Sequence, residues 1–266
     1  GDTVYITAPA KAIEETSVLA AKKTLETWGL NVRIAPHCLG RHHYFSGTDE
    51  ERLADFQDGL DDPSIKAILC ARGGYGCVRI VEALNWDNFK RHPKWIIGFS
   101  DVTVFHQKIH QFGIESIHGI MPLGFTEGSV EAKETLRLAL FGKSVLLETL
   151  SQKENKLGEV RGPLVGGNMT IIYSLMQTEL SYSFENKILF IEDIGEHIYK
   201  IDRMLYAFKM AGIFNQIKGL ILGGFTDMED TDVPFGKTIE ELVLEQVHNL
   251  DIPVAFNMPI GHIHDN

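Results

Sequence analysis

The chain has 266 residues, of which 44% are hydrophobic and 23% are charged, and its formal net charge is −11 at pH 7. This length allows two domains or one large α/β domain, and the composition is that of an ordinary folded protein. Because a net negative surface repels phosphate backbones and anionic lipid headgroups, we expect neither a nucleic acid nor a membrane as a partner.

The cysteines and the apolar runs indicate the compartment. Cys38, Cys70 and Cys77 have no metal-like spacing, so we expect buried or free thiols in a fold that needs no disulfide, which favours a reducing compartment. No apolar run approaches the ~20 residues of a membrane span, and no signal peptide opens the chain. The sequence starts at Gly1 without Met, so a removed leader or a missing terminal segment stays an open alternative.

In the first half of the chain, short β-branched runs alternate with amphipathic segments. This pattern is typical of parallel strands joined by crossover helices, and it predicts a flavodoxin-like or Rossmann-like domain. The expected strands cover residues 3–9, 31–36, 65–71, 94–99 and 114–119, and the expected helices cover 13–28, 48–60, 76–84 and 101–112.

After an expected helix near 130–141 the composition changes. The stretch LLETLSQKENKLGEVRGPLVGGN combines an expected edge strand, a polar segment and two glycine clusters, so we predict a domain boundary there that separates residues 1–150 from 151–266. A second alternation then predicts a smaller C-terminal α/β domain. Its expected helices cover 168–178, 196–211 and 237–249, and its expected strands cover 187–193, 218–225 and 253–259.

The candidate functional residues follow the expected strands. In open parallel sheets, ligands bind beyond the carboxyl ends of the strands. Four segments at such positions carry reactive or anion-binding groups: RGGYG (72–76), GFSD (98–101), IEDIGE (191–196) and GHIHDN (261–266).

Ser100 lies between an expected strand and an expected helix. A serine at such a turn is typical of a nucleophile elbow, in which the hydroxyl is exposed and the next N–H points at a developing oxyanion. The G-x-S-x-G spacing is incomplete, because Val102 stands where glycine is required. The alternative is that Ser100 or Asp101 only caps the following helix.

A serine nucleophile needs a histidine base and a third group that holds the base. The histidines that follow expected strand ends are His118, His262 and His264. Glu192 and Asp193 end the apolar run KILFIED, where a carboxylate must find a partner or have a raised pKa. A cap or an ion pair for the following helix is the alternative role of Glu192. The order Ser, Glu, His is that of α/β-hydrolase triads.

The segment RGGYG is a glycine-rich loop between an expected strand and an expected helix. Its backbone N–H groups can approach an anion closely, so it predicts either a phosphate cradle or half of an oxyanion hole. Because it has neither the G-x-G-x-x-G spacing nor the Lys-Ser/Thr of a P-loop, we expect no nucleotide cofactor.

Two further patterns are interpreted as surface features. His106 and His110 are four residues apart on an expected helix, but no H-E-x-x-H motif or third ligand accompanies them, so we expect polar-face residues and no metal. The acidic segment DMEDTDVP (227–234) could accept a cation or a substrate amine, and a solvated loop is the default interpretation.

In this order, the motifs resemble the L,D-carboxypeptidase family of serine peptidases, which also contains the microcin C immunity proteins. The similarity spans nearly the whole chain, and the short motifs are specific in combination where each alone is not. The family chain usually continues further beyond the GH motif than this sequence does. The matching segments are RGGYG at 72–76, GFSDVT at 98–103, GGN at 166–168, IEDIGEHIYKIDRML at 191–205 and GH at 261–262.

The resemblance implies a catalytic triad divided between two domains. Ser100 is the implied nucleophile, His262 the general base and then acid, and Glu192 the group that orients the histidine. The backbone N–H groups of Gly74 and Asp101 are the implied oxyanion donors. Since family members carry the serine in the N-terminal domain and the other two residues in the C-terminal domain, the resemblance implies an active site in the cleft between them.

The resemblance also implies the activity. Family enzymes remove the terminal D-alanine from murein tetrapeptides in cell-wall recycling, cutting between the L-configured centre of the diamino acid and the D-residue. They need no cofactor or metal and are generally cytoplasmic and dimeric, so the expected partners are a small peptide substrate and a second copy of the chain. Candidates for substrate contacts, including the free carboxylate of the leaving residue, are Arg72, Tyr75, Asn168 and Arg203.

Some alternatives are left open. Asn168 could instead cap a helix, and Arg203 could pair with an acid on its own helix. An immunity-type hydrolase of peptidyl or aminoacyl nucleotides would need an aromatic side chain that stacks on the nucleobase, for which the sequence offers Trp28, Trp86 and Trp95. A non-catalytic two-lobed protein that binds a small anion is the rival from another class.

Overall fold

Two separate parallel sheets organise the chain in the computed structural model, which describes residues 1–266. The first sheet belongs to a unit made of Gly1–Val145 with His264–Asn266, and the second belongs to a unit made of Leu146–Ile263. The predicted α/β class with parallel sheets is confirmed. No helix combines the length and the apolar character that a membrane crossing requires.

The sheet of the first unit has five strands: β1 (Thr3–Thr7), β2 (Asn31–Ile34), β3 (Ile65–Cys70), β4 (Trp95–Gly98) and β5 (Ile117–His118). Their order is β2-β1-β3-β4-β5, and every neighbouring pair is parallel. This is the flavodoxin-like order, in which connections leave β1 and β3 in opposite directions. The carboxyl ends of β1 and β3 therefore form the switch point at which such sheets bind ligands.

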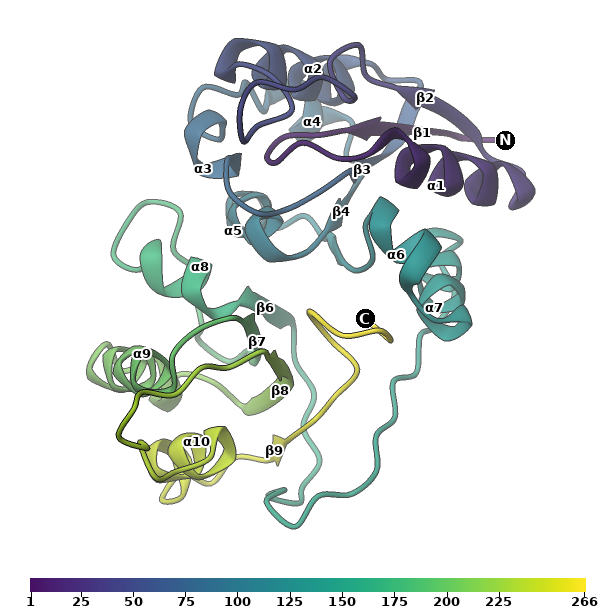
Figure 1. Cartoon of the computed structure of the whole chain (residues 1–266). Coiled ribbons are helices and arrows are strands. Elements are labelled where there is room, and N and C mark those ends of the chain that lie inside the picture. The colour runs from purple at the N-terminus through teal and green to yellow at the C-terminus, as the bar shows by residue number, and fades with distance from the viewer. The chain divides into compact units, whose positions relative to one another are not determined.

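Helices cover both faces of this sheet. The helices of this unit are α1 (Glu15–Thr27), α2 (Asp49–Asp61), α3 (Cys77–Ile80), α4 (Asp87–Arg91), the short 3-10 helix η1 (Ser100–Val102), α5 (Thr103–His110), α6 (Pro122–Glu127) and α7 (Val130–Leu140). α1 packs against α6, whereas α2 packs against β1, β3 and α4 (Figure 1). α2 begins in a capping box, because Thr48 and Glu51 each accept a hydrogen bond from the backbone N–H of the other.

The core of the first unit includes an aromatic cluster. The rings of Phe56 and Phe105 stack with their centroids 4.3 Å apart, and Trp86 packs against both of them. The predicted burial of the cysteines is confirmed, since Cys38, Cys70 and Cys77 are all buried and unpaired.

The second unit has four parallel strands in the order β6-β7-β8-β9. Its elements are β6 (Leu164–Asn168), α8 (Met169–Ser174), β7 (Ile188–Ile194), α9 (Ile198–Met210), the 3-10 helix η2 (Ile213–Asn215), β8 (Gly219–Thr226), α10 (Ile239–Val247) and β9 (Val254–Ala255). Since each strand lies beside its predecessor, right-handed crossovers place the three helices on one face. In agreement, α9 packs against both α8 and α10 (Figure 1).

The predicted edge strand in LLETL (146–150) is wrong. No helix or strand occurs between 143 and 163, and Leu146 and Leu150 are 77% and 85% exposed. The edge strand is instead β6. Its two glycines replace the β-branched residues that are typical of a strand, so its sequence does not indicate one. A Cβ on Gly166 would lie 1.9 Å from the Phe190 carbonyl oxygen, so the close approach of β7 requires glycine there.

Other expected elements have the right type and shorter bounds. The strands expected at 114–119 and 253–259 each contain two paired residues, and the helices expected at 76–84 and 168–178 reduce to α3 and α8. No sequence pattern predicts α4 and α6, because helices of five and six residues are too short to show helical periodicity.

Candidate active site

Ser100 lies at a strained turn between β4 and α5. Its φ angle is +62°, in the left-handed region that residues other than glycine rarely adopt. A serine held in this way between a strand and a helix has the backbone geometry of a nucleophile elbow. A Cβ on Gly98 would lie 2.9 Å from a methyl carbon of Val102, so glycine is needed before the serine and valine is accommodated after it.

The alternative that Ser100 or Asp101 caps the helix is wrong. Neither η1 nor α5 has a side-chain cap. Asp101 is instead buried, and its Oδ2 accepts a hydrogen bond of 2.8 Å from the backbone N–H of Cys77. Burial raises the pKa of the Asp101 carboxyl, which the Cys77 hydrogen bond partly offsets. Asp101 therefore ties the serine turn to the end of the glycine-rich loop.

The glycine-rich loop 72–76 passes directly over Ser100. A Cβ on Gly73 would lie 2.9 Å from the Ser100 Cβ and 3.3 Å from the Asp101 nitrogen. Gly74 and Gly76 have φ angles of +97° and +150°, which non-glycine residues adopt only under strain. Gly74 and the Asp101 N–H, the predicted oxyanion donors, thus belong to two loops in contact. The role of Gly73 was missed, although the double glycine in RGGYG is a signal for close approach.

In the second unit, Glu192 binds His262. The Glu192 side chain is fully buried on β7, at a shift in register between Ile191 and Asp193 where β7 pairs with β8. Its Oε2 lies 2.7 Å from His262 Nδ1 and accepts a second hydrogen bond of 3.3 Å from the His262 N–H. The alternative that Glu192 caps or pairs with the following helix is wrong. A carboxylate on Nδ1 fixes the ring and favours the tautomer that leaves Nε2 as the base.

Glycines make room for this pair. Gly261 has a φ angle of +100°, and a Cβ there would lie 2.5 Å from Glu192 Oε2. A Cβ on Gly223 would lie 3.1 Å from the Glu192 Cβ. The GH motif therefore has a physical basis. Only glycine at position 261 lets the backbone pass close enough to the Glu192 carboxylate for His262 to bind it.

The other candidate histidines have different surroundings. His264 is exposed and lies 3.4 Å from Asp265. His118 lies on β5, and its ring centroid is 5.8 Å from that of Phe99.

Asp193 and Asn168 organise the start of α8. Asn168 Oδ1 accepts a hydrogen bond from the Ile171 N–H at 3.1 Å, which confirms the capping alternative for Asn168. Its amide nitrogen donates to Asp193 at 2.9 Å, and Asp193 also accepts from the N–H and hydroxyl of Thr170. Burial raises the pKa of Asp193, and these hydrogen bonds oppose that rise.

The remaining substrate-contact candidates lie as follows. Arg72 donates to the Ala12 carbonyl at 3.1 Å. Tyr75 is 47% exposed on the glycine-rich loop. Arg203 is exposed on α9, where its guanidinium lies 5.6 Å from the ring centre of Tyr199; no ion pair joins it to an acid of its helix, as the alternative required.

His106 and the acidic loop have local partners. His106 is buried, with Ser116 Oγ and the Gly98 carbonyl each 2.8 Å from its ring nitrogens, so the expectation of a polar-face residue is wrong. Burial lowers the pKa of His106 to about 4. In the acidic loop, Asp230 accepts from the N–H groups of Thr231 and Phe235, as in a self-capped surface loop. No group of three or more His, Cys, Asp or Glu side chains is arranged to hold a metal.

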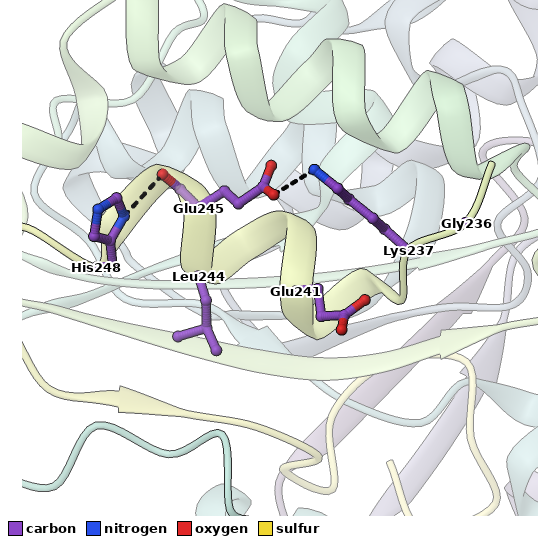
Figure 2. Close-up of a pocket in the computed structure, with 6 residues that line it drawn as sticks. All are labelled: Gly236, Lys237, Glu241, Leu244, Glu245 and His248. Carbon is purple, nitrogen blue, oxygen red and sulfur yellow. Dashed lines mark hydrogen bonds and ion pairs between the residues drawn. The ribbon is translucent and has the colours of Figure 1, made fainter.

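A hollow of about 480 Å³ lies along α10 (Figure 2). Lys237 forms an ion pair with Glu245 at its wall, and the His248 ring lies 3.2 Å from the Glu245 carbonyl. No predicted catalytic residue lines it. The lining residues are Gly236, Lys237, Glu241, Leu244, Glu245 and His248.

Family models match both halves of the chain. The LD-carboxypeptidase N-terminal domain matches residues 4–119, and the LD-carboxypeptidase C-terminal domain matches residues 161–266. A Bacillus subtilis protein named probable murein peptide carboxypeptidase is 32% identical over 98% of this chain and 84% of its own length. The murein tetrapeptide carboxypeptidase of Pseudomonas aeruginosa is 32% identical over 97% of this chain and 87% of its own length.

Two solved structures have the same fold. The muramoyltetrapeptide carboxypeptidase from Oxalobacter formigenes is 28% identical, with a TM-score of 0.88 over 99% of this chain and 90% of that one. The microcin C7 self immunity protein MccF is 22% identical, with a TM-score of 0.84 over 98% of this chain and 88% of that one, a likeness in fold alone. Because the family models match both halves of the chain and the two relatives are each 32% identical to it, this chain belongs to the LD-carboxypeptidase family.

Proposed function

We propose that this protein is a serine-type L,D-carboxypeptidase that releases the terminal D-alanine of murein tetrapeptides. The Pseudomonas aeruginosa and Oxalobacter formigenes proteins, with their tetrapeptide carboxypeptidase names, support the substrate. One observation carries the catalytic part: the buried hydrogen bond of 2.7 Å between Glu192 and His262. A serine peptidase needs an oriented base of this kind, whereas a protein that only binds an anion has no use for it.

The proposed mechanism is acyl transfer. Ser100 Oγ attacks the carbonyl carbon of the scissile amide while His262 Nε2 takes its proton, and the imidazolium that forms is stabilised by Glu192. The N–H groups of Gly74 and Asp101 stabilise the oxyanion. His262 then gives the proton to the departing amine of D-alanine, and water hydrolyses the acyl-enzyme by the same steps.

The test is to incubate the protein with tetrapeptides that carry either diaminopimelate or lysine at the third position. Mass spectrometry should detect loss of one alanine from at least one of them with the wild type and no loss with Ser100→Ala. If both tetrapeptides stayed intact, the proposed substrate would be wrong.

The same assay separates the rivals. An aminoacyl sulfamoyl adenosine that is cleaved while the tetrapeptides are not would indicate an immunity-type hydrolase. Trp86 is unsuited to stack on its base, because it packs in the aromatic core. A serine-directed phosphonate that fails to label Ser100 would favour the binding protein. A cytoplasmic location and a homodimer, implied by the family resemblance, belong to the proposal, and light scattering tests the dimer.

A further inference from the structure

Cationic side chains surround the glycine-rich loop 72–76, and among them only Lys11 lacks an oxygen partner. Arg52 and Arg79 both bind Asp49, and Arg72 donates to a backbone carbonyl. The ammonium group of Lys11 has neither a carboxylate nor a carbonyl partner. In a chain with 36 acidic and 25 basic residues, an ammonium without an anionic partner beside a catalytic loop indicates that a ligand supplies the anion.

Lys11 is fixed against the loop at the switch point of the first sheet. It follows β1, its backbone N–H donates to the Gly73 carbonyl at 3.3 Å, and Gly73 in turn touches Ser100. A Cβ on Gly74 would lie 3.0 Å from the Lys11 Cβ and 3.3 Å from its Cδ, so the half-buried stem of Lys11 lies along the proposed oxyanion loop. The ammonium end lies over the Tyr44 ring and is the part of the side chain that a ligand oxygen can reach.

Tyr44 supplies a second donor at the same place. Its hydroxyl oxygen would lie 2.8 Å from a Cβ on Gly74, and its ring centre lies 5.0 Å from Lys11 Nζ. The Ala12 N–H donates to the Tyr44 carbonyl at 3.1 Å, which holds this segment across the chain that follows β1. The phenol hydroxyl has no hydrogen-bond partner in the protein.

We propose that Lys11 and Tyr44 form the subsite that binds the free terminal carboxylate of the leaving residue, an inference that rests on the proposed function. An ammonium and a phenol hydroxyl beside one oxyanion donor match a carboxylate close to the scissile amide. A charge-assisted hydrogen bond from a half-buried lysine is stronger than a neutral one. This subsite takes the role that the sequence suggested for Arg72 or Arg203; Arg72 instead donates to the Ala12 carbonyl.

The experiment compares two substrates that differ only in the group recognised. The tetrapeptide that the wild type cleaves is prepared with its free terminal carboxylate and as the terminal amide, and kcat and KM are measured for both. Lys11→Met should lower kcat/KM on the acid roughly 10- to 100-fold, mainly through KM, and change the amide by less than about 3-fold. Lys11→Arg should keep most of the preference for the acid, and Tyr44→Phe should lose part of it.

Lys90→Met is the matched control, because Lys90 is an exposed lysine on α4 that pairs with Asp87. It should leave both substrates unchanged. Equal losses on acid and amide in Lys11→Met, or no loss on either, would overturn the subsite while leaving the proposed function standing. If Lys11→Met did not fold, the acid-to-amide ratio of Tyr44→Phe would decide. A wild type that cleaves neither substrate would overturn the proposed function and the subsite with it.

Discussion

At the residue scale, Ser100, Glu192 and His262 act as one unit in the proposed mechanism. We therefore expect Ser100→Ala and His262→Ala each to lower kcat by about 10³-fold or more, and the double variant to lose little beyond either single one. The measurement is D-alanine release under saturating tetrapeptide, with circular dichroism to show that the fold is kept. Nearly full turnover in Ser100→Ala would rule out the triad.

Glu192→Gln should cost less activity than either of these changes. The Oε1 of Glu192 is buried without a hydrogen-bond partner, so a glutamine amide must place its NH₂ either there or against His262. Both placements weaken the orientation of the ring but leave Ser100 and the imidazole present. A kcat that falls below that of His262→Ala would contradict this ranking.

Gly261 and Gly236 form a matched pair for testing the close crossing over Glu192. Their φ angles are +100° and +83°, so alanine strains the backbone at both, by about 1–2 kcal/mol. Only at Gly261 would the new Cβ meet the Glu192 carboxylate, since nothing lies within 4 Å at Gly236. We expect both variants to lose thermal stability, Gly261→Ala more because of the clash with Glu192, and only Gly261→Ala to lose at least about 10²-fold in kcat. Equal kcat values for Gly261→Ala and Gly236→Ala would show that the close approach of Gly261 to Glu192 is not critical for activity.

At the element scale, His106 joins α5 to β4 through the Gly98 carbonyl, and it makes stability depend on pH. Its pKa is about 4 when folded, against an ordinary value of 6.5. Between these values the unfolded chain binds more protons. The free energy of unfolding should therefore fall as pH drops from 6.5 towards 4, by on the order of 3 kcal/mol from this residue.

Urea midpoints of the wild type and of His106→Gln at several pH values from 7 to 4.5 test this contribution. The variant should be less stable at pH 7, and its deficit should shrink as the pH falls. Parallel curves for the two proteins would contradict the prediction.

The sequence predicts the helices and strands whose residue pattern lies within the element itself. It misses those that depend on contacts with a neighbouring strand or helix. β3, β4, β7 and β8 were visible as β-branched runs, and α2 was visible from its capping box and apolar spacing. β6 was missed because its glycines are required by the close approach of β7, and no local sequence pattern shows that contact. The same limit holds at the site. The motifs gave Ser100, Glu192 and His262, whereas the contacts of Gly73 with Ser100, of Gly261 with Glu192 and of Lys11 with Tyr44 depend on chain segments brought together by folding.

At the scale of the whole molecule, the segment 143–163 should be the first site of limited proteolysis, because it has no helix or strand while each unit has its own core. Trypsin should cut first at Lys153 and Arg161, whose side chains are 91% and 92% exposed. Lys156 should resist, since its ammonium group binds carbonyls that include Val247 and Leu250. Mass spectrometry of the first fragments tests this order.

Lys153→Gln combined with Arg161→Gln is the control, and it should slow the first cut. First cuts inside either sheet unit would show that the segment is better protected than its exposure indicates.

The left-handed backbone at position 100 also constrains how this protein can evolve. Glycine would relieve the torsional strain there, so Ser100→Gly should melt above Ser100→Ala, by on the order of 1 kcal/mol, although both lack the hydroxyl. Under the proposed mechanism, selection for hydrolysis keeps a serine that selection for stability alone would replace with glycine. A lineage that no longer needed the reaction should drift towards glycine at this codon.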